Sequence, residues 1–130
     1  MNRADLENRL RELGIYSDFY YRRELKALAQ LLDGNEQLNC VLTGVHEANR
    51  KMIAVTDRRV IVIFAGAIAA GDITVIKRDA VRSWSFDKKL LFSSVTITTD
   101  SGSEFTFTNT QGGLKDLFDW AMEKPVPEEN

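Results

Sequence analysis

Few side chains in this sequence have the chemistry of a catalyst or a metal ligand. The chain of 130 residues contains one histidine, His46, and one cysteine, Cys40. A Cys–His nucleophilic pair requires the two side chains within hydrogen-bond reach, yet six residues along one strand separate them by roughly 20 Å. A metal site needs three or four nitrogen, sulfur or carboxylate ligands at defined spacing, and scattered carboxylates around one histidine supply no such set. We therefore expect no enzyme activity, no metal and no other cofactor.

Basic side chains are the feature that best suggests a ligand. Arg50 and Lys51 fall in a predicted polar loop at 46–50 and just after it, and Arg58 and Arg59 fall at the next turn. Together they are candidates for binding an anionic lipid or another phosphorylated ligand. At about 1 kcal/mol for each base near an anionic bilayer, four bases give about 4 kcal/mol, which corresponds to about millimolar affinity. We expect at most weak contact with an anionic membrane, and solvated loop charge is the simpler interpretation.

Length and charge exclude several other classes. A chain of 130 residues is long enough for one domain with its own core. Seventeen basic and nineteen acidic side chains leave a net charge of -2, so no overall positive field would attract nucleic acid. The sequence has no run of eighteen apolar residues and no apolar signal-peptide core near its start. A cytoplasmic location is the corresponding expectation.

The first third of the chain has helical periodicity. Leucines at positions 6, 10 and 13 predict a first helix over 3–13 that ends at Gly14. A second helix is predicted from Ser17 to Asp33, with one apolar face. This face comprises Tyr21, Leu25, Leu28 and Leu32. Residues 1–34 are therefore predicted to form an N-terminal helical hairpin.

After Gly34 the apolar period changes to two, which indicates β-strands. Seven strands are predicted, at 38–45, 51–56, 59–64, 73–77, 81–86, about 91–98 and about 105–108. In the sixth strand, Leu91 is expected to alternate inward with Val95 and Ile97. An amphipathic helix from Gly112 to the stop at Pro125 would close the fold. The predicted fold class is mainly β (α+β): residues 35–124 form a seven-strand antiparallel sandwich or partly open barrel with a C-terminal helix, and residues 125–130 form a flexible acidic tail.

The third predicted strand is apolar on both faces, so something must cover its outer face. Leaving large apolar side chains in water would forfeit roughly 1.5 to 3 kcal/mol for each one. Two interpretations remain open: the N-terminal helices cover this face, or a second copy of the chain does. The candidate interface residues are Ile61, Ile63, Leu25, Leu28 and Leu32.

The segment 54–62, Ala-Val-Thr-Asp-Arg-Arg-Val-Ile-Val, resembles the hairpin between the second and third strands of bacterial pleckstrin-homology-like (PH-like) domains, in particular the YokE-like PH family. Gly34-Asn35-Glu36 is similar to the entry of that family's first strand, and 76–84 to a later strand junction. The resemblance covers roughly residues 35–123. It implies a bent seven-strand sandwich with a closing helix, and members that bind phosphoinositides, peptides or proteins or that self-associate. We therefore expect a non-catalytic interaction module that binds protein or itself, with anionic-ligand binding as the alternative.

Overall fold

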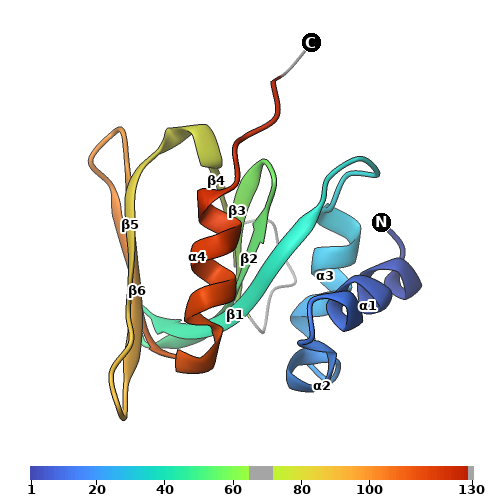
Figure 1. Cartoon of the computed structure of the whole chain (residues 1–130), viewed down its shortest axis with the longest axis horizontal. Coiled ribbons are helices and arrows are strands. Elements are labelled where there is room, and N and C mark those ends of the chain that lie inside the picture. Colours follow the sequence, from blue (N-terminus) through green and yellow to red (C-terminus); the bar gives the residue numbers. More distant parts are fainter. Residues whose placement is uncertain (65–71, 129–130) are drawn as a thin grey trace.

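The computed structural model describes residues 1–64 and 72–128 (Figure 1). Three helices lead the chain: α1 (Arg3–Glu12), α2 (Tyr16–Phe19) and α3 (Glu24–Leu31). The strands that follow are β1 (Leu38–His46), β2 (Asn49–Thr56), β3 (Arg59–Phe64), β4 (Ile73–Lys77), β5 (Val81–Asp87), β6 (Ser93–Thr99) and β7 (Glu104–Thr110). Short 3-10 helices, η2 (Arg78–Ala80) and η3 (Gly112–Leu114), precede β5 and the last helix, α4 (Lys115–Glu123). Two segments lie outside the described residues: 65–71, which is rich in glycine and alanine, and the last two residues of the predicted tail.

The seven strands form one antiparallel sheet in the order β4-β3-β2-β1-β7-β6-β5, and this sheet does not close into a barrel. The predicted fold class is confirmed. The sheet folds over where β1 crosses β7, and Val45–Thr108 is the single ladder pair described there. Gly44 permits the crossing, because a Cβ at this position would lie 2.8 Å from Thr110 Cγ2 and 2.9 Å from Phe107 Cβ. The two halves of the sheet therefore meet at a glycine.

The first hairpin is tighter than the sequence suggested. The prediction of a polar loop at 46–50 is wrong, because β1 extends to His46 and β2 starts at Asn49. Glu47 and Ala48 make a two-residue turn with φ angles of 50° and 66°. Two left-handed residues are what a type I′ turn requires. Neither residue is the asparagine or glycine that is typical of this turn, so the turn could not be predicted from residue type.

The predicted second helix is broken between Phe19 and Glu24. Phe19 and Leu25 are both buried, but six residues on one continuous helix would place them about 120° apart around the axis. The break allows α2 and α3 each to turn its own apolar face inward. Tyr21, predicted on the inner face, is 64% exposed in the linker. No helix in the described part of the chain is long and apolar enough to cross a membrane.

Two apolar clusters occupy the two sides of β3. Ile61 and Ile63 belong to the cluster beneath the N-terminal helices, together with Leu25, Leu28 and Leu32. Val60 and Val62 belong to the cluster between the halves of the sheet and α4. Figure 1 shows the helices α1 to α3 at one side of the sheet and α4 across its open side. Within the chain, the N-terminal helices cover the Ile61–Ile63 side of β3, and all five candidate interface residues are buried.

The last helix closes the open side of the sheet, as predicted. Phe118 on α4 lies 5.8 Å from the Trp84 ring and 5.7 Å from the Phe86 ring, centroid to centroid. The buried guanidinium of Arg78 donates to the carbonyl of Met122, at 2.8 Å, and to the carbonyls of Thr56 and Asp57. One cation therefore ties the C-terminal end of α4 to the β2–β3 turn.

Candidate functional site

The Thr-Asp-Arg-Arg segment builds the turn between β2 and β3. Thr56 Oγ1 accepts hydrogen bonds from the backbone N–H groups of Arg58, at 3.0 Å, and Arg59, at 2.8 Å. Asp57 exchanges two hydrogen bonds with the backbone of Gln37, one through its carboxylate and one through its own N–H. The hydroxyl and carboxylate thus replace backbone partners that a tight turn leaves unpaired. The turn is thereby attached to the segment that precedes β1.

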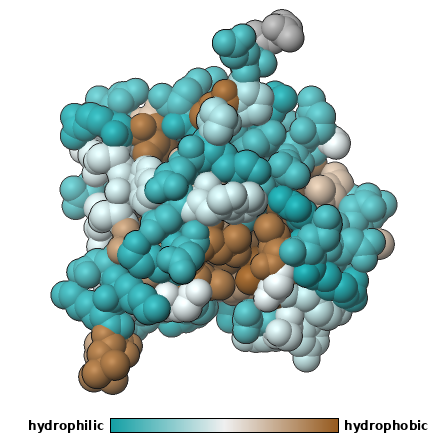
Figure 2. All heavy atoms as spheres, viewed as in Figure 1, coloured by the Kyte–Doolittle hydropathy of each residue, from teal (hydrophilic) through white to brown (hydrophobic). Residues whose placement is uncertain are grey.

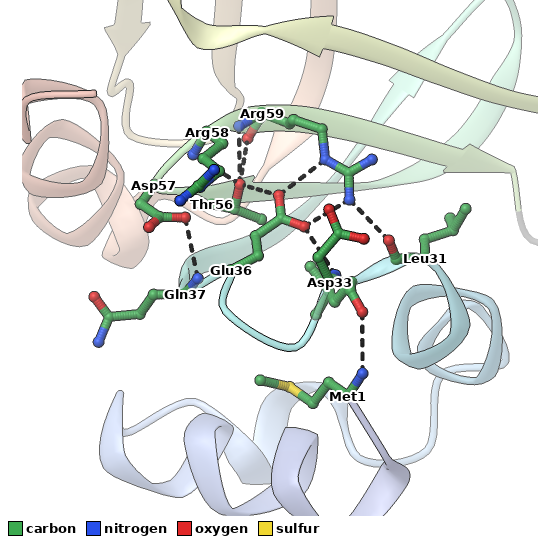
Figure 3. Close-up of polar contacts among 10 residues, drawn as sticks. Met1, Leu31, Asp33, Glu36, Gln37, Thr56, Asp57, Arg58 and Arg59 are labelled. Carbon is green, nitrogen blue, oxygen red and sulfur yellow. Dashed lines mark hydrogen bonds and ion pairs between the residues drawn. The ribbon is translucent and has the colours of Figure 1, made fainter. Parts of the chain in front are cut away.

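Behind this turn lies the Glu36 node, in which the buried Glu36 and Thr56 meet the partly buried Arg59 (Figure 3). Arg59 donates to Glu36 through Nε, at 2.9 Å to Oε2, and through Nη2, at 2.6 Å to Oε1. Thr56 Oγ1 donates to Glu36 Oε2 at 2.6 Å. Arg59 Nη2 also donates to the Leu31 carbonyl at the end of α3, at 2.8 Å. The node joins the N-terminal helices to the sheet.

Both charges of the node are stabilised in their ionised forms. Burial acts to raise the pKa of Glu36, but hydrogen bonds from Arg59 and Thr56 outweigh it, so this pKa is lowered. The hydrogen bonds to Glu36 raise the pKa of Arg59. A carboxylate with a lowered pKa that accepts from a fixed guanidinium is not suited to proton transfer near neutral pH. The arrangement is that of a structural ion pair, and a ligand at Arg59 would have to displace Glu36.

The four candidate basic residues do not form one patch. Arg50 and Lys51 lie at the β1–β2 end of strand β2, whereas Arg58 and Arg59 lie at its other end. Seven residues from Lys51 to Arg58 at about 3.3 Å each give roughly 23 Å. The exposed Arg50 donates to Thr43 Oγ1 at 3.1 Å. Consecutive hairpins place alternate turns at opposite ends of a sheet, so the two basic pairs cannot hold one small ligand together.

Lys51 and the Arg58–Arg59 pair border separate depressions, and Arg50 lines neither. Lys51 lines a cavity of about 330 Å³ with His46 and Asp72, among others. Arg58 and Arg59 line a second cavity, of about 170 Å³. The remaining residues around this second cavity are Asp33, Lys77, Asp79, Val126 and Pro127. Among the described residues, Arg58 Nε is buried without a hydrogen-bond partner, so one cationic group at this cavity is not fully satisfied by its own chain.

The single cysteine and histidine lie apart. Cys40 is buried in the core between the sheet halves, and burial raises the pKa of its thiol. His46 lies at the far end of β1, where Nδ1 is 3.1 Å from the carbonyl oxygen of Thr106. Across residues 1–64 and 72–128, no three His, Cys, Asp or Glu side chains are grouped so that they could hold a metal ion.

Sequence reasoning missed a run of three exposed apolar side chains. Leu90, Leu91 and Phe92 are 99%, 81% and 63% exposed in the loop between β5 and β6. The prediction that Leu91 faces inward on the sixth strand is wrong, because β6 begins only at Ser93, which takes the buried position instead. The signal was present in the sequence: three consecutive large apolar residues cannot all face one side of a strand.

This loop projects from the body of the molecule. We call residues 88–92 the β5–β6 tip. Figure 1 places the end of the β5–β6 hairpin at the lower left, and Figure 2 shows a hydrophobic projection there with hydrophilic surface at its base. None of the three apolar residues belongs to either core cluster of the described chain. The β5–β6 tip therefore has no packing role within the described protein.

Solved structures with a similar fold have little sequence identity to this chain. The C-terminal domain of an unknown protein from Leishmania infantum matches with a TM-score of 0.50 and 14% identity, over 82% of this chain and 94% of that one. A pleckstrin homology domain from Shewanella amazonensis SB2B matches with a TM-score of 0.48 and 15% identity, over 75% and 94%. A protein of the DUF1696 family with a pleckstrin-homology domain, from Shewanella loihica PV-4, matches with a TM-score of 0.46 and 13% identity, over 75% and 91%.

The sequence itself also matches a family. No curated protein matches the chain significantly. The model of the family described as bacterial PH domain matches residues 32–120, which include every strand of the sheet and most of α4. The narrower YokE-like assignment stays a prediction. With most of the chain matched and the expected strand order and closing helix in place, this protein belongs to the bacterial PH domain family.

Proposed function

We propose that this PH domain is a non-catalytic interaction module that binds protein, and in the first place a second copy of itself, through the edge of β4. The observation that carries the proposal is an apolar side chain on an edge strand: Val75, at the centre of β4, is 46% exposed. In the described sheet, β4 pairs with β3 alone. An unpaired strand edge is a template for another strand.

The geometry of β4 suits a symmetric contact. Its five residues, Ile73–Lys77, are centred on Val75. If two copies of β4 pair antiparallel about a two-fold axis at Val75, then Ile73 of one copy lies opposite Lys77 of the other, and the two Val75 side chains cover each other. A two-fold contact of this kind is self-complementary and closes after two copies. The exposed residues of β5, at the other edge, are all polar, namely Arg82, Ser83, Ser85 and Asp87, so β5 is a poorer candidate.

Light scattering on the intact chain at tens of micromolar and above tests this proposal. We expect a dimer for the native sequence and a monomer for Val75→Lys, which would place two like charges against each other at the axis. The matched control is Ser85→Lys, which adds the same charge to the other edge strand and should leave the dimer intact. A native protein that is monomeric throughout this range would contradict the proposal, as would loss of the dimer in the control alone.

An anionic ligand at the β2–β3 end is the second candidate. It is supported by the unpartnered Nε of Arg58 and by the presence of Arg58, Arg59 and Lys77 around one cavity. Because Asp33 and Asp79 line the same cavity, we expect weak binding of a small phosphorylated ligand. Titration with inorganic pyrophosphate, followed by calorimetry, should give heat with the native chain and none with Arg58→Gln. Equal heats in both proteins would remove this candidate.

A further inference from the structure

We infer that the β5–β6 tip is a shallow membrane-insertion element, which enters the interface of a bilayer that contains anionic lipid. Leu90, Leu91 and Phe92 would enter the lipid, while Lys88 and Lys89 contact headgroups. This site is separate from the β4 edge, and the inference does not rest on the proposed dimer. It also differs from the basic residues Arg50, Lys51, Arg58 and Arg59, which are in other loops.

The apolar side chains of the β5–β6 tip are exposed to solvent. Leu90 is almost wholly exposed, and among the described residues Tyr21 is the one other large apolar side chain as exposed as Leu91 or Phe92. Three adjacent exposed side chains form a continuous apolar surface, unlike the isolated exposed residues that every protein surface carries. Water contact at such a surface is unfavourable, so it is explained by an occupant that removes the water.

The loop projects from the sheet. The paired residues Asp87 and Ser94 close its base, and residues 88–92, between the end of β5 and the start of β6, leave the sheet. The space-filling view shows the apolar surface at the end of a projection, with no wall beside it (Figure 2). A protein partner would need a pocket that complements this convex shape, whereas a bilayer adapts to it. The projecting form favours a lipid surface as the occupant.

The order of charged and apolar residues along the loop fits an anionic lipid surface. Lys88 and Lys89 come directly before the apolar residues and are exposed at the base of the tip. Lys89 Nζ lies 3.5 Å from a carboxylate oxygen of Asp87, and both side chains are more than half exposed, so this contact is a weak surface pair. With the apolar end in the lipid, the two lysines would stand at the level of the phosphates. Cations at that level are attracted by anionic lipid.

The backbone limits how deep the tip can go. Loop backbone groups that lose water without gaining partners are costly within the hydrocarbon. Amphipathic elements that lie at an interface bury their apolar side roughly 5–10 Å, at the boundary between headgroups and acyl chains. The side chains of a five-residue loop reach this boundary while its backbone remains near the headgroups. The tip is therefore suited to peripheral attachment at the surface.

Sedimentation of the full chain with vesicles tests the inference. Two vesicle compositions are used: phosphatidylcholine alone, and an equimolar mixture of phosphatidylcholine and phosphatidylserine. We expect the native protein to sediment with the mixed vesicles. Leu90→Ser/Leu91→Ser should lower the partition coefficient by about a hundredfold, roughly tenfold for each leucine. Lys88→Gln/Lys89→Gln should remove about a tenfold preference for the mixed vesicles, a preference that salt also weakens.

The matched control removes two exposed aromatic side chains elsewhere. Tyr20→Ser/Tyr21→Ser changes the α2–α3 linker, where both residues are at least half exposed, and should leave vesicle binding unchanged. Because the apolar residues of the β5–β6 tip belong to neither core cluster, the Leu90/Leu91 variant should keep the native thermal transition. A loss of binding in this variant then reports on the tip and does not arise from misfolding.

A probe attached to the tip measures insertion directly. Cys40 is buried, so a polarity-sensitive fluorophore attached to Leu91→Cys labels the tip selectively. Its emission should shift to the blue when mixed vesicles are added, and the same label on Tyr21→Cys should not shift.

Four results would overturn the inference. The first is a native protein that stays in the supernatant with both vesicle types. The second is equal binding by the Leu90/Leu91 variant, since binding would then not need the tip. The third is an unshifted label at position 91. The fourth is a dimer that forms without vesicles and is lost in the Leu90/Leu91 variant, which would make a second copy of the chain the occupant of the tip.

Discussion

At the Glu36 node each charged side chain faces a partner from the same chain, whereas at the β5–β6 tip three apolar side chains face solvent. The node contains the residue types that usually suggest chemistry, a carboxylate, a hydroxyl and a guanidinium. The tip contains leucines and a phenylalanine, which usually suggest a core. Residue type alone therefore identifies neither the binding groups nor the structural groups of this molecule. What separates a structural group from a binding group is whether its own chain has already satisfied it.

The largest expected effect comes from breaking the node. Glu36→Ala leaves the Arg59 guanidinium without its carboxylate behind the β2–β3 turn, and loss of one partner from a buried pair typically costs about 3 kcal/mol or more. Urea denaturation of the native and variant chains measures this loss. Glu7→Ala is the control: it removes the carboxylate of the partly exposed Arg3–Glu7 pair, and the free energy of unfolding should fall by about 0.5 kcal/mol or less. Similar losses in the two variants would mean that the Glu36 node contributes no more to stability than a partly exposed ion pair does.

A second buried cation should behave like the node and unlike the lysines of the tip. Arg78→Met removes the donors to the carbonyls of Met122, Thr56 and Asp57. Leaving buried carbonyls unpaired should lower the free energy of unfolding by about 2 kcal/mol. The exposed Arg82 on β5 supplies the control: Arg82→Met should change the free energy of unfolding by less than about 0.5 kcal/mol. Thermal unfolding followed by circular dichroism distinguishes these outcomes.

Acid should weaken the node in a predictable direction. The folded-state pKa of Glu36 lies below its ordinary value of 4.5, so the carboxylate contributes stability above its unfolded-state pKa. That contribution is lost as the pH falls through the lowered folded-state pKa. From about pH 5 downward, the stability of the native chain should fall by about 1 kcal/mol more than that of Glu36→Gln, which has no proton to bind. If the native chain and Glu36→Gln lost equal stability in acid, protonation of Glu36 would not be the cause of the loss.

The smallest effect on stability is expected at the tip. Leu90→Ser/Leu91→Ser should change the free energy of unfolding by no more than about 0.5 kcal/mol, because neither side chain packs on a core. Phe118→Ala, in the buried helix α4, should instead cost about 3 kcal/mol. If the tip variant were as unstable as the Phe118 variant, the tip would have a packing role and the comparison with the node would fail.

Periodicity predicted the parts of the fold that depend on local alternation. The third and fourth strands, 59–64 and 73–77, have the predicted bounds, and the predicted closing helix buries Phe118 and Ala121. Periodicity failed where the backbone departs from a regular element. Glu47 and Ala48 adopt left-handed conformations without glycine, and the break after Phe19 is decided by packing with residues far along the chain.

The contacts of the candidate basic residues could not be predicted from local sequence patterns, because they too involve residues far along the chain. Arg58 and Arg59 were identified as basic turn residues, but the partner of Arg59 is Glu36, which lies 23 residues earlier. Alternation assigns a side chain to a face and carries no information about which polar group it meets there. The β5–β6 tip could have been found, since three consecutive apolar residues contradict alternation. A local violation of the pattern was the more informative signal.

The crossing at Gly44 has a consequence for how the molecule opens. One ladder pair, Val45–Thr108, joins β1 to β7 in the described sheet, whereas five or more register pairs join each neighbouring strand pair within either half. Hydrogen bonds between the Gln111 side chain and Thr43 add to this single pair, and α4, which is anchored through Arg78, packs across both halves. Native-state hydrogen exchange should therefore resolve two cooperative units, β1–β4 with the N-terminal helices and β5–β7, and detachment of α4 is the event that uncouples them.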